Sequence, residues 1–99
     1  APESAQLALA SALVLQGEGR LEEALDTIRT AVARHPDDPD LQARHAELLA
    51  AFGRFGEART AVSRALELRS DYPPALTVLG FLDLVEGEVD GTIQMARGE

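Results

Sequence analysis

A short sequence pattern occurs twice in this 99-residue chain, at a distance of 34 positions. GRLEEALDTIRTAV begins at Gly19 and GRFGEARTAVSRAL begins at Gly53, with Gly, Arg, Glu and two Ala in the same places. A third glycine, Gly87, follows after another 34 residues. A fixed period of this size is typical of stacked supersecondary units, none of which buries its apolar face alone. We therefore expect a single domain, residues 1–99, made of three repeats.

Each repeat is predicted to form two helices. Ala and Leu are the most frequent residues of the chain, and both favour helix. Glycine-containing steps interrupt the pattern where short turns between helices are expected. Asp38 is predicted to be an N-cap, with Pro39 at the first helical position. The expected helices span residues 4–16, 20–34, 39–52, 55–69, 73–86 and 89–97.

The second helix of each repeat is predicted to bury a stripe of small and branched apolar residues. Small side chains let two helix axes approach closely, and bulkier ones fill the space around that contact. The stripe recurs at helical spacing in the first two repeats: Ala24, Ile28, Ala31 and Val32, then Ala58, Val62, Ala65 and Leu66.

These features resemble the tetratricopeptide repeat. That family has a Leu-Gly or similar pair in the first helix, a glycine turn, Ala and Ala-Leu in the second helix, and a following proline. The corresponding residues here are Leu79-Gly80, Gly53, Ala58, Ala65-Leu66 and Pro36. The resemblance covers almost the whole chain, with repeats at about 5–38, 39–72 and 73–99, the last one incomplete. It implies an all-α fold, a right-handed α-α superhelix of antiparallel helix pairs.

Three residues depart from the family pattern. Ser70 replaces the proline that usually ends the second repeat, and Thr92 stands where Ala24 and Ala58 predict alanine. His45 occupies a position at which the family usually buries Leu. We expect a partly buried, hydrogen-bonded histidine there, in preference to a pH switch.

The resemblance also implies a concave groove that binds peptides or extended protein segments. Side chains from the first helix of each repeat would line it, with Leu9, Leu13, Phe81 and Leu84 as apolar anchors. Arg44 and Glu47 would set the polarity of the bound segment. The remaining expected groove residues are Gln6, Gln16, Asp40, Ala43, Ala50, Thr77 and Val85. A well-known subclass grips a C-terminal carboxylate with Lys and Asn, and this chain has neither residue, so acidic tails are not expected ligands.

Two segments are apolar nearly all round, LALASALVL at residues 7–15 and ALTVLGFLDLV at residues 75–85. A helix of that kind is usually covered on more than one side. The groove could bind an apolar segment, the chain could self-associate, or neighbouring repeats could cover these faces. The last residues, DGTIQMARGE, begin a sixth helix without completing it, which predicts a solenoid that is cut short or completed by another chain.

The overall charge argues against several classes of partner. Nine basic and 17 acidic residues give a net charge of −8, which repels nucleic acid and anionic membrane surfaces. There is no cysteine, and the two histidines have no metal-ligand spacing. The acidic pairs at residues 22–23 and 37–38 suit helix capping and solvation. No cofactor, metal or catalytic residue is predicted, so we do not expect an enzyme.

The function predicted from the sequence is a protein–protein interaction scaffold that binds a peptide or protein segment. A homo-oligomerisation module and an accessory domain of a larger enzyme are the alternatives. No segment is apolar for long enough to span a membrane, and no signal peptide is expected. The sequence leaves the compartment open, with cytoplasm favoured over periplasm. All nine basic residues are Arg, which suggests a GC-rich, bacterial genome.

Overall fold

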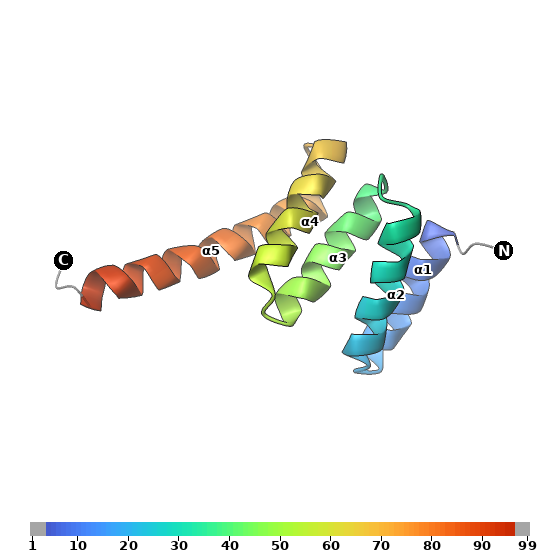
Figure 1. The fold of residues 1–99 in the computed structure, drawn as a ribbon, viewed down its shortest axis with the longest axis horizontal. Helices are drawn as coiled ribbons and strands as arrows, with labels where there is room; N and C mark the ends of the chain where they lie inside the picture. The colour runs from blue at the N-terminus through green and yellow to red at the C-terminus, as the bar shows by residue number, and fades with distance from the viewer. Residues whose placement is uncertain (1–3, 97–99) are drawn as a thin grey trace.

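Five α-helices make up the described part of the chain, residues 4–96, for which side chains are described up to residue 87 (Figure 1). In this computed structural model the helices are α1 (Ala5–Gly17), α2 (Leu21–Arg34), α3 (Pro39–Ala51), α4 (Phe55–Leu68) and α5 (Pro73–Ala96). The first four form two antiparallel pairs, α1 with α2 and α3 with α4. The all-α fold of helix pairs predicted from the repeat is confirmed.

Side-chain caps define where the first helix of each complete repeat begins. The Ser4 hydroxyl accepts a hydrogen bond from the Leu7 amide at 3.1 Å at the start of α1. The Asp38 carboxylate accepts one from the Leu41 amide at 3.2 Å, and Pro39 follows at the first helical position of α3. Such caps satisfy backbone donors that have no partner within the helix. The predicted N-cap at Asp38 is confirmed.

The turns within the two complete repeats share one backbone geometry. Gly19 and Gly53 have φ angles of 78° and 76°, a left-handed conformation that glycine adopts without strain. The amide of Gly19 donates to the Gln16 carbonyl at 3.0 Å, and the amide of Arg20 donates to the Leu15 carbonyl at 2.8 Å. These two bonds form a Schellman motif, which ends α1 and returns the chain as α2. The same bonds, shifted by 34 residues, end α3.

The core lies around α3, which contacts all four other helices. Most of the two predicted apolar stripes is buried in it: Ala24, Ile28, Ala58, Val62 and Ala65 are fully inaccessible to solvent, whereas Val32 and Leu66 are partly buried. Leu48 and Leu49 of α3 fill the space beside these small side chains. Close approach at alanine with larger residues on either side is the packing that the sequence predicted.

The predicted break after residue 86 is wrong, because α5 continues as one helix through Gly87 and Glu88 to Ala96. Among the described residues only Gly19 and Gly53 have a positive φ, so Gly87 does not form the turn of its two counterparts. The end of the predicted sixth helix, at residue 97, and the side chain of Thr92 lie outside what the structure describes.

Two substitutions within the third repeat explain why the turn is not formed. Arg20 and Arg54, which follow the glycine, form ion pairs with Glu23 and Glu57 in the first turn of the next helix. At the position after Gly87 the third repeat has an acidic residue instead. Asp83 stands where the first two repeats have Leu15 and Leu49, and a returning helix would have to cover its carboxylate. Asp83 is exposed and forms an ion pair with Arg59 of α4, and burying a charged pair is unfavourable, so the helix runs on.

One face of α1 remains exposed although its counterpart in α3 is buried. Leu7 is 53% exposed, whereas Leu41, one repeat later, is 0% exposed. Val14 is 61% exposed, whereas its counterpart Leu48 is 1% exposed. In α3 this face packs against the preceding helix pair, chiefly α2. The outer face of α1 therefore has the side chains of a packing surface and no covering helix among the described residues.

This contrast predicts unequal effects for one substitution at two positions. Leu41→Ala is expected to lower the free energy of unfolding by about 2–5 kcal/mol, because it removes a buried side chain and leaves a cavity. Leu7→Ala is expected to lower it by about 0.5 kcal/mol or less. Urea unfolding of dilute protein, followed by circular dichroism, measures both values. Equal losses would contradict the exposure of this face of α1.

Candidate functional site

A groove of about 460 Å³ lies between α3 and α5, the first helices of the second and third repeats. Most of the side chains that line it are apolar or have a satisfied polar group. The Thr77 hydroxyl, for example, donates to the Pro73 carbonyl at 3.0 Å within its own helix. The lining residues are Glu47, Ala50, Ala51, Pro74, Thr77, Val78 and Phe81.

Phe81 is the largest side chain of the groove and is 47% exposed. Its ring contacts that of Phe55 at the start of α4, with centroids 6.2 Å apart and planes tilted by 56°. This edge-tilted contact fixes one side of the ring, and the rest of it is accessible to solvent. Phe81 therefore offers a partly fixed aromatic surface to an apolar group.

Glu47 supplies the carboxylate of the groove. Arg44 donates from Nη1 to its Oε1 at 3.1 Å, one turn earlier on α3. The Arg44 side chain is about one-quarter exposed and that of Glu47 about half exposed, so solvent weakens their attraction. The pair fixes the orientation of Glu47 more than it stabilises the fold.

The structure brings four of the expected groove residues together here: Glu47, Ala50, Thr77 and Phe81. The others lie elsewhere. Leu84 lines a separate hollow with Gly80, Asp83 and Gly87. Leu9 is partly buried against the core, Leu13 is half exposed, and Gln16 and Arg44 are intermediate. Ala43, also expected in the groove, is buried in the core.

Three groove residues were not predicted: Ala51, Pro74 and Val78. Helical spacing contained a signal for two of them. Pro74, Thr77, Val78 and Phe81 are spaced i, i+3, i+4 and i+7, so all four lie on one face of α5. Ala51 is the last residue of α3, and no comparable spacing indicated it.

A second hollow of about 520 Å³ lies between α2, α3 and α4. His45 lines it, and its Nε2 atom is buried without a hydrogen-bond partner among the described residues. The predicted partial burial of His45 is confirmed, and the predicted hydrogen bond is absent at this atom. Burial lowers the pKa of His45 below 6.5, and the charges of Arg29 and Arg54 lower it further, against an opposing effect of Glu57.

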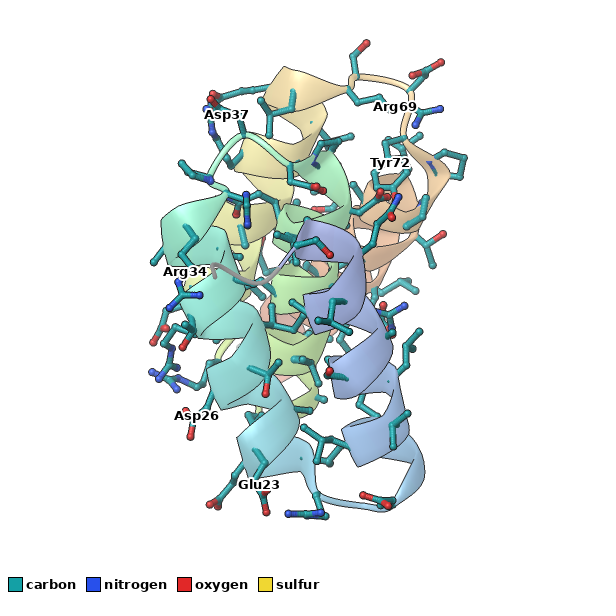
Figure 2. The ribbon with its side chains drawn as sticks, turned by 90° about the vertical axis from the view of Figure 1, so that its right-hand side faces the viewer. Glu23, Asp26, Arg34, Asp37, Arg69 and Tyr72 are labelled. Carbon is teal, nitrogen blue, oxygen red and sulfur yellow. The ribbon has the colours of Figure 1, made fainter. Side chains whose placement is uncertain are left out.

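The charged residues of the second helices point away from the core. Figure 2 shows Glu23, Asp26 and Arg34 on the outer side of α2, each directed away from α1 and α3. In the connection between α4 and α5, the Arg69 guanidinium lies 5.1 Å from the centre of the Tyr72 ring (Figure 2). α1, in contrast, contains no charged residue.

The lowered pKa of His45 predicts that stability decreases in mild acid. Unfolding restores the ordinary pKa, so the unfolded chain binds the proton more readily than the folded chain does. The contribution of neutral His45 to the free energy of unfolding is therefore fully present above about pH 6.5 and is lost as the pH falls below that value. His45→Leu should give a flatter profile of unfolding free energy between about pH 7.5 and 5.5. If the two profiles were parallel, His45 would not be the residue that lowers stability in mild acid.

Comparisons with known proteins agree with the geometry of the repeats. A family model described as tetratricopeptide repeat matches residues 15–80, more than half of the chain. The search of curated proteins found no match. Within the described residues, no helix is both long and apolar enough to cross a membrane. The 34-residue period, the paired helices, the glycine turns and the family model lead to one conclusion. The chain belongs to the tetratricopeptide-repeat family.

Proposed function

We propose that the chain is a protein–protein interaction scaffold that binds a peptide or protein segment in the groove between α3 and α5. Repeats of this family generally mediate protein–protein interactions and are typically non-catalytic. The observation that supports this site is the half-exposed Phe81 in an apolar groove. Phe81 lies among the other apolar residues of the groove, and an exposed apolar patch marks an interaction surface, whereas a single exposed side chain does not.

The shape and chemistry of the groove suit one apolar side chain of a longer segment. Its volume of about 460 Å³ is in the range of ligand sites, and α3 and α5 form its two walls. Val78 and Phe81 would contact the apolar side chain, and Glu47 would contact polar groups of the segment. Most of the binding free energy would come from Phe81, since aromatic residues dominate such contacts.

Substitution of Phe81 tests this proposal. Phe81→Glu is expected to weaken binding by about tenfold or more, because it puts a charge where an apolar side chain would pack. The probe is a labelled pool of short peptides, each with one fixed Leu and uncharged residues at all other positions. Fluorescence anisotropy measures its dissociation constant.

Phe52→Glu is the matched control, because Phe52 is 37% exposed and does not line the groove. It should bind the pool as the parent does. An equal loss of peptide binding in both variants would show that the added charge disturbs the fold and does not act at the groove. The proposal fails if the folded parent binds no peptide of the pool.

Self-association through α1 is a second candidate function, favoured by the exposed Leu7 and Val14. Both residues lie on a face that is buried in the next repeat, and α1 has no charge to oppose pairing with a second copy. The chain as a whole has a net charge of −8 and would repel a second copy. At α1 this repulsion is weakest, because two such helices carry no charge of their own.

Solution mass separates the two candidates. Self-association would give a mass above 10.6 kDa that rises with concentration, and Leu7→Glu would return it to 10.6 kDa. Light scattering coupled to size exclusion measures this, with Phe52→Glu as control for an added charge. A constant 10.6 kDa at every concentration would exclude self-association through α1.

A further inference from the structure

The groove between α3 and α5 has a counterpart one repeat earlier. Every residue that lines it has an equivalent 34 positions before it, on α1 or α3. Glu47 belongs to both sets, because it lines the groove and is also the equivalent of Phe81. We call this preceding region the α1–α3 half-site. Its residues are Leu13, Gln16, Gly17, Asp40, Ala43, Arg44 and Glu47.

The groove and the half-site differ in chemistry at equivalent positions. Val78 and Phe81 of the groove correspond to Arg44 and Glu47 in the half-site. Pro74 of the groove corresponds to Asp40. Along α3 and α5, equivalent positions therefore change from charged in the half-site to apolar in the groove. A ligand that spans the half-site and the groove meets two different environments.

The half-site has two carboxylates and one guanidinium, so negative charge is in excess there. Arg44 donates to only one carboxylate oxygen of Glu47, Oε1. Asp40 is exposed and forms no ion pair with any described residue. Oε1 of Gln16 is buried and has no hydrogen-bond partner in the part of the chain that the structure describes. A positively charged group that donates hydrogen bonds would pair with the exposed carboxylates of Asp40 and Glu47.

We propose that the bound segment has an apolar side chain in the groove and a Lys or Arg side chain in the α1–α3 half-site. This inference rests on the proposed function and specifies the class of partner. The basic side chain donates to Glu47, and Asp40 on the same helix, together with the net charge of −8, attracts a basic segment over longer distances. Of the charged groups in the half-site, only Arg44 repels it, and Glu47 partly neutralises that charge.

The spacing of the two side chains follows from helix packing. Axes of packed helices are about 8–10 Å apart. An extended segment advances about 3.3 Å per residue, so about three residues separate the basic side chain from the apolar anchor. Because the direction of the segment is not fixed by this distance, the test places the basic residue on either side.

Three kinds of labelled peptide pool test the inference. Each has a fixed Leu, and the residue three positions away, on either side, is Arg, Gln or Glu. The Arg pools are expected to bind about fivefold more tightly than the Gln pools, and the Glu pools more weakly than both. This advantage should decrease as the ionic strength is raised from about 0.01 M to about 1 M. Fluorescence anisotropy gives the dissociation constants.

The double substitution Asp40→Asn with Glu47→Gln is expected to remove the advantage of Arg over Gln. The matched control is Asp26→Asn with Glu67→Gln, which makes the same change in net charge at exposed positions on α2 and α4. This control should keep the advantage. If both double variants lost the advantage of Arg over Gln, the preference would come from net charge, and the proposed half-site would be wrong.

The remaining outcomes separate the inference from the proposed function. Equal binding of the three kinds of pool, all weakened by Phe81→Glu, overturns the basic half-site and leaves groove binding intact. Tighter binding of the Glu pools also overturns it. If the folded parent binds none of the pools, both the inference and the proposed function are wrong.

Discussion

Close contact between alanine-bearing helix faces is the interaction on which this structure depends. Ala24 and Ala58 are fully buried in the second helices, and Ala12 and Ala46 are fully buried in the first helices. Side chains this small let the helices approach closely, and larger residues then fill the space around each contact. α3 touches all four other helices, so the positions of α1 and α5 are both set relative to it. The groove between α3 and α5 follows from the same contacts.

Local sequence signals predicted most of the fold. The N-cap at Asp38, the turn glycines and the alanine stripes each indicate a feature that their immediate neighbours decide. The continuation of α5 through Gly87 was not predictable in this way. Glycine permits the left-handed turn but does not require it, and the outcome depends on whether a returning helix can pack. The sequence feature that distinguishes the third repeat is Asp83, at the position where the second repeat buries Leu49.

The candidate site was predictable only in part. Glu47, Thr77 and Phe81 were placed in the groove by the family pattern, and they line it. Leu84 lies one turn beyond Phe81 on the same face of α5, but it lines a different hollow to which no described residue of α3 contributes. The unpaired Nε2 of His45 and Oε1 of Gln16 depend on the positions of neighbouring helices, about which a repeat pattern contains no information.

The contacts between helices connect only neighbours along the array. Among the described residues, α1 contacts α2 and α3 but neither α4 nor α5. In such a molecule stability is a sum of local contributions, as in a one-dimensional chain of coupled units, and cooperativity decays with distance along it. A partner held between α3 and α5 would therefore protect the last two repeats from hydrogen exchange more than the first. The first helix pair could unfold on its own while the groove stayed intact.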